Sequence, residues 1–269
     1  MQYDPIKKSL GKLFNRTPFL RVLFYKLLDI LLLRTWYVKK EIRKWAKEKN
    51  NPVTILDAGS GFGQYSFFIS GMSKNWTIHG VDVKEEQIRD CTDFFAQIKR
   101  KNVSFETADL TTFIKAETYH LILSVDVMEH ILNDVQVFRN FYQSLAKNGM
   151  LLISTPSDQG GSDVHDHAEE DSFIDEHVRD GYNLFEIQEK LKNAGFTKTN
   201  AYYAYGKPGQ IGWRLSMKYP IMMLNASRFC FILLPFYYLL SFWVALFCNF
   251  IDFWFKHKSG TGLIVRAWK

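Results

Sequence analysis

The sequence is poor in cysteine, with only Cys91, Cys230 and Cys248 among 269 residues. Their spacing matches neither a metal site nor a redox pair, and two of them lie in apolar sequence. Cysteine therefore gives no support to zinc or disulfide chemistry. Its scarcity indicates a reducing compartment such as the cytosol.

The N-terminal region lacks the features of a secretory signal. Arg21, Lys26 and Asp29 interrupt its apolar run, and no small-residue cleavage site follows. We therefore expect the catalytic part of the chain to stay in the cytosol.

Charge is missing from one long stretch, residues 229–251. These 23 residues contain no Asp, Glu, Lys or Arg and are rich in Phe, Leu, Tyr and Trp. As a helix, the stretch is long enough to cross a bilayer core of about 30 Å. Hydropathy alone predicts a transmembrane helix, so the neighbouring sequence has to decide whether the chain crosses.

What the chain does contain is a glycine turn. Residues 57–63 read D-A-G-S-G-F-G, between the apolar residues 53–56 and the helix-compatible residues 64–69. Alternate glycines let a ligand lie against bare backbone. The dinucleotide fingerprint reads G-x-G-x-x-G and holds pyrophosphate, whereas the carboxylate of Asp57 would repel an anion and suits an ammonium group.

Further strands follow the turn at regular intervals. Residues 77–82 form a second predicted strand ending in Asp82, 19 residues after Gly63, which is the span of one crossover helix. Short β-rich runs then recur, with helical patterns between them, at residues 103–110, 119–125 and 149–156. This alternation predicts an α/β fold with a mostly parallel sheet and helices on both faces.

The order of these motifs resembles that of the class I S-adenosylmethionine-dependent methyltransferases, from about residue 53 to 206 and again at the last few residues. The resemblance implies a Rossmann-like seven-stranded sheet with an antiparallel last strand, and S-adenosylmethionine as cofactor. Asp57 and the glycines would hold its methionine part, Asp82 its ribose and Asp109 its adenine. The implied cofactor-binding set is Asp57, Gly59, Ser60, Gly61, Gly63, Asp82, Val83, Asp109, Leu110 and Val125.

Methyl transfer depends mainly on aligning the acceptor with the methyl carbon, and a base is needed only where the acceptor must lose a proton. His130 is the first candidate base, because it ends the segment 124–130 that would close the pocket and histidine is the commonest general base in enzymes. The alternative is a structural histidine that hydrogen-bonds the backbone where a loop meets a helix.

The same segment offers a metal alternative. Asp126, Glu129 and His130 resemble the acidic cluster with which the ubiquinone-pathway O-methyltransferases bind a divalent cation. Similar acid-histidine pairs occur in methyltransferases without metal, and nothing else in the sequence supports a metal. We therefore predict none.

A polar run follows the fifth predicted strand, from residue 163 to 179. Such a run is typical of a solvated loop that covers a pocket. At its end, before a predicted helix at residues 184–193, His177, Arg179 and Tyr182 are candidates for acceptor contacts. His177 is also the second candidate base.

Basic charge is concentrated in residues 1–50, which hold 13 Lys or Arg and 4 Asp or Glu, a net of +9, against −3 for the remainder. Within them, Arg21, Lys26 and Asp29 lie on one side of a helical pattern, and the other side is apolar: Leu20, Leu23, Phe24, Leu27, Leu28 and Leu31. This predicts an interfacial helix on a membrane surface with anionic lipid. The alternative is a helix packed on the enzyme or over its pocket. Apolar residues outnumber polar ones, so we predict no nucleic-acid partner.

The uncharged stretch belongs to a longer insertion, residues 208–258. Residues 262–268 look like the antiparallel last strand, and a single crossing would leave them on the wrong side of the membrane. We therefore predict a helical hairpin lying in one leaflet, with a short helix around residues 211–223 and a long one after residue 226. Pro220 would lie near the turn, and Pro235 would start or kink the second helix. The alternatives are a single span with the last strand outside the sheet, and a hydrophobic dimer interface.

Three parts of the chain follow from these patterns: a basic amphipathic segment (1–50), a methyltransferase domain (51–207 and 259–269) and the hairpin (208–258). We predict a methyltransferase on the cytoplasmic side of a membrane, peripheral or monotopic, with a lipophilic acceptor, O-methylated as a quinone, phenol or lipid. The alternatives are a non-catalytic scaffold at the membrane and a soluble homodimeric enzyme for small molecules. The acceptor stays open, because loops and the insertion build its pocket.

Overall fold

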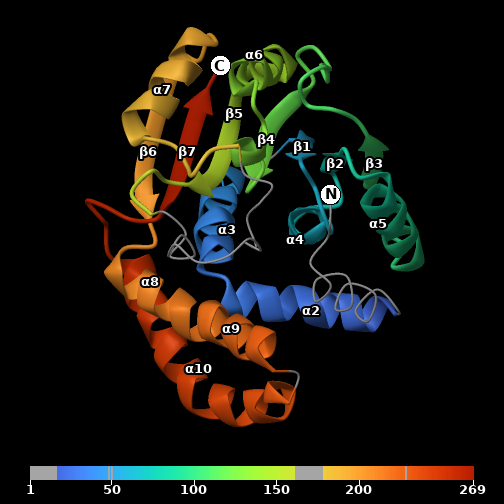
Figure 1. Ribbon diagram of the computed structural model, residues 1–269. Helices are drawn as coiled ribbons and strands as arrows, with labels where there is room; N and C mark the ends of the chain where they lie inside the picture. The colour runs from blue at the N-terminus through green and yellow to red at the C-terminus, as the bar shows by residue number, and fades with distance from the viewer. Residues whose placement is uncertain (1–16, 48, 50, 161–177, 228) are drawn as a thin grey trace.

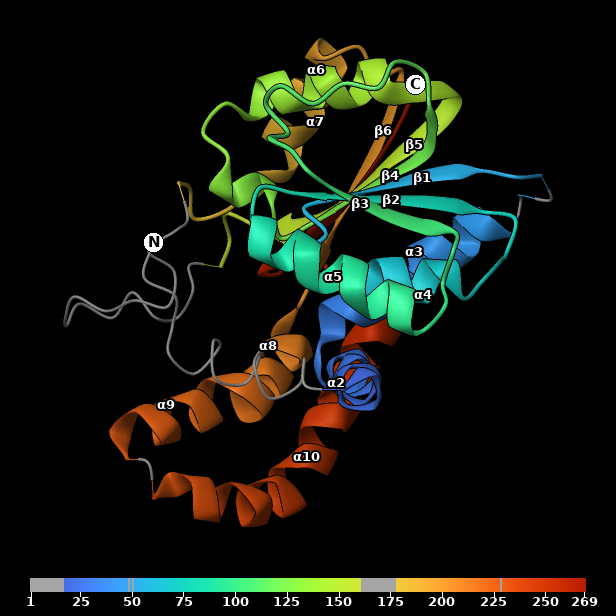
Figure 2. The same ribbon diagram turned by 90° about the vertical axis from the view of Figure 1, so that its right-hand side faces the viewer.

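The computed structural model describes residues 17–47, 49, 51–160, 178–227 and 229–269 (Figure 1). Within these ranges the chain forms a seven-stranded sheet with helices on both faces. A helical hairpin projects from one side of this unit (Figures 1 and 2).

The strand order is β3-β2-β1-β4-β5-β7-β6. Neighbours from β3 to β5 are parallel, and β7 is antiparallel to both β5 and β6. The predicted fold class is therefore confirmed. The strands are β1 (Thr54–Ala58), β2 (Thr77–Asp82), β3 (Val103–Thr107), β4 (Tyr119–Val125), β5 (Leu145–Pro156), β6 (Lys198–Ala204) and β7 (Gly262–Trp268).

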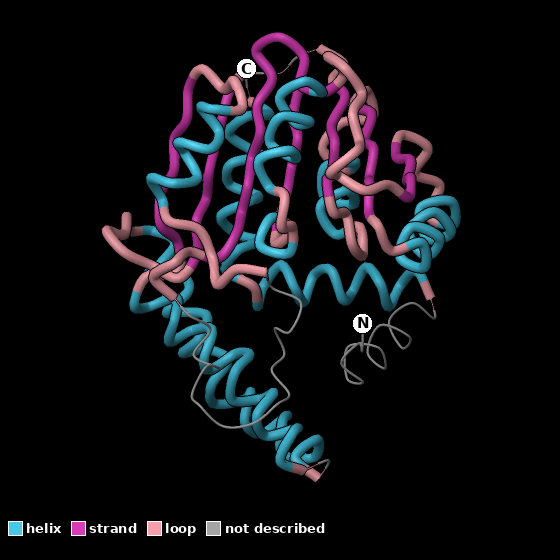
Figure 3. Tube along the Cα trace, turned by 45° about the horizontal axis from the view of Figure 1, so that its top comes forward, coloured by secondary structure: helices cyan, strands magenta, loops and turns pink. Residues whose placement is uncertain are grey.

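Two layers of helices cover the sheet (Figures 2 and 3). On one face, Phe138 and Leu191 are buried in a core with the strands, and on the other face Tyr37 and Ile42 fill a second core. Because Tyr37 and Ile42 belong to α3, this part of the basic segment 1–50 is integral to the catalytic unit. The first layer is α6 (Asp134–Ser144) and α7 (Leu184–Asn193), and the second is α3 (Leu33–Ala46), α4 (Gln64–Ser70) and α5 (Glu85–Gln97).

The first and last residues of α7 match the prediction, and each end of the helix has a local cause. The side-chain oxygen of Asn183 accepts the backbone N–H of Phe185 at 2.9 Å, which caps the first turn. After the helix, Gly195 has a φ of 114°, a conformation that side chains disfavour.

Helix α2 (Pro18–Leu31) packs on the enzyme through Arg21 of its predicted polar side and through Tyr25, whereas Lys26 of that side is exposed. Arg21 is 3% exposed and Tyr25 is 2% exposed, whereas Phe19 is 74% exposed and Leu23 also points outward. The alternative of a helix packed on the enzyme therefore holds for this side, and contact of the other side with a membrane stays a prediction. One side packs on the catalytic unit, and the other offers an apolar stripe.

The hairpin lies between β6 and β7. Its first arm is α8 (Lys207–Trp213), the π-helical turn η2 (Arg214–Lys218) and α9 (Tyr219–Ala226), and its second arm is α10 (Cys230–Trp254). The chain reverses at Ser227, after the first arm and before the second, as predicted. Pro220 lies in the first turn of α9, where its missing N–H is tolerated. Pro235 lies inside α10, which bends along its length (Figure 2).

Small and polar residues join the two arms. Gly212 lies so close to Asn249 that an added Cβ would overlap its side chain. The Tyr237 and Tyr238 hydroxyls donate to backbone carbonyls of η2, at 2.7 Å and 2.8 Å. Since a π-turn leaves carbonyls without ordinary helical partners, these bonds stabilise it.

Asp252 fixes the hairpin to the catalytic unit. It is fully buried and accepts hydrogen bonds from the Tyr37 hydroxyl on α3 at 2.8 Å and from the Gly209 N–H on α8 at 2.9 Å. The ring of His257 lies 3.3 Å from the same carboxylate. One side chain therefore ties both arms to α3.

Among the described residues, α10 alone is long and apolar enough to cross a membrane, and only 6% of its most apolar window is buried. The strand that follows it, β7, pairs with β5 and β6 inside the sheet. The alternative of a single span with the last strand outside the sheet is therefore wrong. The chain returns to the catalytic unit after α10.

Candidate active site

The glycine turn joins β1 to α4 through left-handed backbone. Gly59, Gly61 and Gly63 have φ values of 76°, 50° and 73°. A Cβ on Gly59 would overlap Val127, and one on Gly63 would press on Cys91 at 3.2 Å. Only glycine satisfies these conditions, and the turn consequently presents bare backbone at the carboxyl edge of the sheet.

Asp57 lies at the end of β1 and is buried. Its Oδ2 accepts hydrogen bonds from the Ser66 hydroxyl at 2.6 Å and the Ser66 N–H at 3.1 Å, which fixes α4. Burial, only partly opposed by these bonds, raises the pKa of Asp57 to about 6.

The raised pKa predicts a pH-dependent affinity for S-adenosylmethionine. The folded protein takes up a proton on Asp57 as pH falls through about 6, and the neutral carboxyl no longer attracts an ammonium group. We expect the affinity to fall about tenfold between about pH 7.5 and about pH 5, since about a tenth of Asp57 is then ionised. Calorimetric titration measures this change. In Asp57→Asn the affinity should be lower and flat over the same range, and a flat profile in the parent would contradict the assignment.

Asp82 ends β2 and is held in place before any ligand arrives. Its Oδ2 accepts the N–H of Gly61 at 2.9 Å, and its Oδ1 accepts the N–H of Lys84 at 2.9 Å. Each carboxylate oxygen keeps a lone pair for a further donor, so both can accept ribose hydroxyls.

The other predicted cofactor residues surround this edge. Ser60 is buried, and its hydroxyl has no hydrogen-bond partner among the described residues. Val83 is exposed beside Asp82, as a side chain that stacks on a base would be. Asp109 is exposed and caps a turn through the Thr111 N–H at 2.8 Å. Of the remaining two, Leu110 is buried and Val125 is half-buried at the end of β4.

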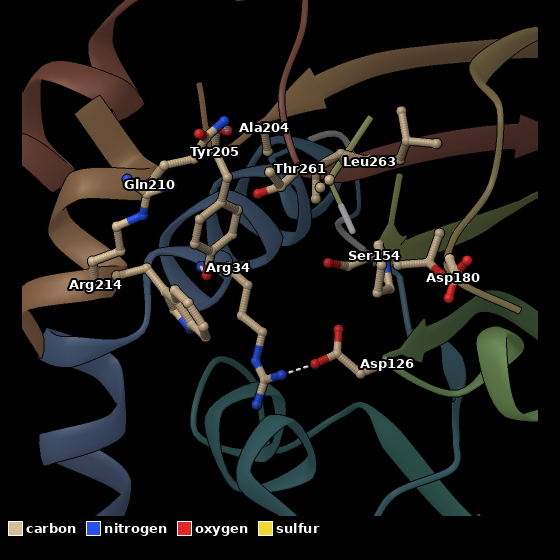
Figure 4. Close-up of a pocket in the computed structure, with 16 residues that line it drawn as sticks. Arg34, Asp126, Ser154, Asp180, Ala204, Tyr205, Gln210, Arg214, Thr261 and Leu263 are labelled. Carbon is tan, nitrogen blue, oxygen red and sulfur yellow. Dashed lines mark hydrogen bonds and ion pairs between the residues drawn. The ribbon is translucent and has the colours of Figure 1, made fainter. Parts of the chain in front are cut away.

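A cavity of about 230 Å³ adjoins this edge, between the sheet and the base of the hairpin (Figure 4). We call it the Arg34 cavity. The carboxyl ends of β4 and β5, the start of β7, and α8 with η2 line it, together with Arg34 at the start of α3. Its wall includes Arg34, Asp126, Thr155, Tyr205, Trp213 and Arg214.

A family profile described as a methyltransferase domain matches residues 49–205, more than half of the chain. The chain belongs to the class I S-adenosylmethionine-dependent methyltransferases. The predicted family, enzyme class and cofactor are confirmed. The glycine turn, the two carboxylates and the unpartnered Ser60 hydroxyl fit S-adenosylmethionine.

Similar proteins act on different acceptors. The chain is 31% identical over 146 residues to a phosphoethanolamine N-methyltransferase of Triticum aestivum. This match covers 53% of this chain and 27% of that protein. It is 30% identical over 115 residues to a malonyl-[acyl-carrier protein] O-methyltransferase of Bacillus cereus. This match covers 42% of this chain and 41% of that protein. The chain thus spans well under half of the length of these relatives.

The fold is similar to that of Haemonchus contortus phosphoethanolamine N-methyltransferase 2, solved with S-adenosyl-L-methionine. The TM-score is 0.61 at 18% identity, over 87% of this chain and 52% of that one. For a putative sarcosine dimethylglycine methyltransferase from Galdieria sulphuraria the TM-score is 0.55 at 14% identity, over 86% of this chain and 82% of that one. At these identities the likeness shows the fold alone.

Of the two candidate bases in this methyltransferase, the structure describes only His130. His130 ends the short 3₁₀ helix η1 (Met128–His130) after β4 and is exposed. His177 lies outside the described residues. Beside His130, Glu129 is buried and accepts the Thr155 hydroxyl at 3.0 Å, and burial raises the pKa of its carboxyl.

One contact of the cavity was absent from the sequence predictions. Arg34 forms an ion pair with Asp126, and its backbone N–H donates to the Tyr205 hydroxyl at 2.8 Å (Figure 4). The pair joins α3 to the end of β4, 92 residues later in the chain. No local pattern links two residues so far apart. Only the basic character of residues 1–50 pointed to Arg34.

Arg179 and Tyr182 contact protein groups instead of facing the cavity. Arg179 pairs with Asp134 and donates to the Ile131 carbonyl at 2.7 Å, and the buried Tyr182 hydroxyl donates to Asp134 at 2.8 Å. Their role is therefore to hold the segment after β4 against the start of α7. Opposite charge lowers the pKa of Asp134 despite its burial.

The alternative metal cluster is divided among other partners. Asp126 is paired with Arg34, and Glu129 is bonded to Thr155. Within the described part of the chain, no three His, Cys, Asp or Glu side chains come together as a metal site.

Proposed function

We propose that this methyltransferase is a monotopic enzyme on the cytoplasmic side of a membrane, and that it methylates a lipophilic acceptor in the Arg34 cavity. The observation that carries the proposal is the position of that cavity. Trp213 and Arg214, at the base of the hairpin, form part of its wall. An acceptor that enters along the hairpin reaches the cofactor edge without crossing bulk water.

The hairpin has the residue distribution of a lipid-immersed element. Its buried contacts are made by Gly209, Gly212, Ser241, Ala245 and Asn249, which are small or polar. Its large apolar side chains point outward, among them Phe236, Leu239, Leu240, Trp243, Phe247 and Phe250. In membranes small residues let helices pack closely, because lipid removes the hydrophobic drive to bury large ones. An outer surface of this kind also marks an interaction site.

The chemistry divides between two sets of residues. S-adenosylmethionine supplies an activated methyl group. The glycine turn and Asp82 hold the cofactor at the carboxyl edge, and the cavity wall orients the acceptor toward it. His130 is exposed after β4 and is not among the described residues that line the cavity, and it stays the candidate base where the acceptor must lose a proton.

The relatives do not fix the acceptor atom, since their names include N-methyltransferases and O-methyltransferases. For this chain we favour O-methylation of a quinone-, phenol- or lipid-type molecule. Incubation of the purified enzyme with methyl-labelled cofactor and membranes of the source cell identifies the acceptor. Label in the lipid extract supports the proposal, and label only in water-soluble products contradicts it. Asp82→Ala is the inactive control.

His130→Ala is expected to lower kcat by about 100-fold or more on an acceptor that loses a proton, because general base catalysis contributes at least that factor. The rate is measured for both proteins at saturating S-adenosylmethionine, and calorimetry should give both the same dissociation constant for the cofactor. Full activity in the variant would remove His130 as the base.

The dimer alternative rests on the same outward side chains of α10. A soluble dimer would bury them against a second copy, and the protein would then stay in the supernatant when sedimented with vesicles. Vesicle sedimentation together with the mass in solution therefore separates the two functions.

A further inference from the structure

Helix α2 has two sides with different partners. Its inward residues Arg21 and Tyr25 are buried on the catalytic unit, whereas Phe19, Leu23 and Leu27 are exposed. We call the exposed side the α2 stripe, made of Phe19, Leu23, Leu27 and Ile30. At 3.6 residues per turn, these four positions lie opposite Arg21 and Tyr25.

The inward side holds the glycine turn directly. Arg21 Nη2 donates to the carbonyl of Phe62 at 2.8 Å, and the Tyr25 hydroxyl donates to the same carbonyl. Arg21 also donates to Cys91 Sγ at 3.1 Å, and that thiol donates to the carbonyl of Gly61 at 3.3 Å. Two successive carbonyls of the cofactor turn are thus fixed by one buried group of side chains.

A second contact lies further along α2. Asp29 accepts a hydrogen bond from the Gln64 side chain at 2.8 Å, in the first turn of α4, and forms an ion pair with Lys39 of α3. Helix α2 consequently contacts the chain on both sides of Gly63, through the carbonyl of Phe62 and the side chain of Gln64. Any force that moves α2 changes the turn that receives the cofactor.

The outward side fits a lipid surface. The views of Figures 1 and 2 place α2 at the side of the catalytic unit from which the hairpin projects. The stripe is a second exposed apolar surface beside that of α10, and the exposed Lys26 lies at its edge. A lysine beside an apolar stripe matches a helix lying at an anionic membrane surface.

We infer that α2 couples contact with the membrane to cofactor binding, so that the enzyme binds S-adenosylmethionine more tightly on a membrane; the inference rests on the proposed function. When α2 is docked on the glycine turn, its stripe faces the lipid. Lipid contact therefore stabilises the docked helix, and the docked helix stabilises the closed turn. Linkage makes the effect reciprocal, so the cofactor strengthens lipid binding by the same factor.

The test compares proteins that the hairpin keeps on the same vesicles, made of phosphatidylcholine and phosphatidylglycerol. The double variant Leu23→Lys/Leu27→Lys removes apolar contact from the α2 stripe and leaves Arg21 and Tyr25 in place. We expect its dissociation constant for S-adenosylmethionine to be about tenfold higher than that of the parent, within the usual range of coupling between sites. Phe185→Lys on α7 is the matched control, since Phe185 is also exposed but lies on the other face of the sheet. Its dissociation constant should equal that of the parent.

A second background tests the route of the coupling. Arg21→Met removes the bonds to Phe62 and Cys91, and in that protein the two lysine substitutions should cause no further loss of affinity. Equal affinity of the parent and the double-lysine variant for S-adenosylmethionine on vesicles would overturn the coupling. The coupling would also be overturned if the two lysine substitutions lowered this affinity as much in Arg21→Met as in the parent. Failure of the parent to sediment with vesicles would instead overturn the proposed function.

Discussion

Replacement of Asp82 by Ala is expected to raise the dissociation constant for S-adenosylmethionine by about 100-fold or more, as measured by calorimetry. Each hydrogen bond from a ribose hydroxyl to a carboxylate contributes about 1.5–3 kcal/mol, and Asp82 offers two. The substitution also removes the acceptor that fixes the N–H of Gly61 at 2.9 Å. Loss of ligand contacts and loosening of the turn therefore act in the same direction.

The controls separate these two effects. Asp93→Ala removes an exposed carboxylate from α5 and should leave the affinity unchanged. Asp82→Asn keeps an oxygen that can accept one backbone N–H but loses the charge, and its affinity should fall between those of the parent and Asp82→Ala. Parent-like affinity in Asp82→Ala would show that the ribose is held elsewhere.

The second large effect concerns the hairpin. Arginine in place of Phe236, Leu240 and Trp243, which share the exposed side of α10, should release the protein from vesicles. One charge near the centre of a bilayer costs about 2.5–3.5 kcal/mol and less near its surface, so three lower the partition coefficient by about 100-fold or more. Sedimentation with vesicles measures the bound fraction.

Phe185→Arg is the matched control for the arginine variant, because it adds a charge at an exposed aromatic position away from the hairpin. This control should sediment with vesicles like the parent. Unchanged sedimentation of the triple variant would exclude α10 as the anchor. If the parent is a dimer in water and the triple variant a monomer, the outer side of α10 is a protein interface.

The strands and the glycine turn could be predicted because their signals are local. β2 has its predicted bounds, and Gly59, Gly61 and Gly63 form the predicted turn, each with left-handed backbone. The end of β3 was placed too late, at residue 110, because the Thr112 N–H turns back to the Asp109 carbonyl at 3.0 Å. In the sequence, a turn that ends a strand is harder to recognise than the apolar run that forms the strand.

The orientation of α2 could not be predicted, because an amphipathic pattern does not say which side meets the protein. Arg21 lies on the polar side, yet it is the most buried charged group of the helix, since carbonyls of the glycine turn satisfy its guanidinium. The reversal of the hairpin was placed within a few residues, but Pro220 makes no break in the first arm, because it lies in the first turn of α9, which continues to Ala226. The Arg34–Asp126 pair joins distant segments and has no sequence signal.

The position of β7 sets the order in which the enzyme can be assembled during synthesis. β6 joins the sheet only through β7, and the whole hairpin lies between these strands in the chain. Because the ribosome makes the chain from its N-terminus, α8 to α10 emerge before the strand that gives β6 a neighbour. The growing chain thus completes its helical hairpin while its sheet is still open, and the sheet closes only afterwards. Translation therefore delivers the hairpin first and the finished catalytic unit second.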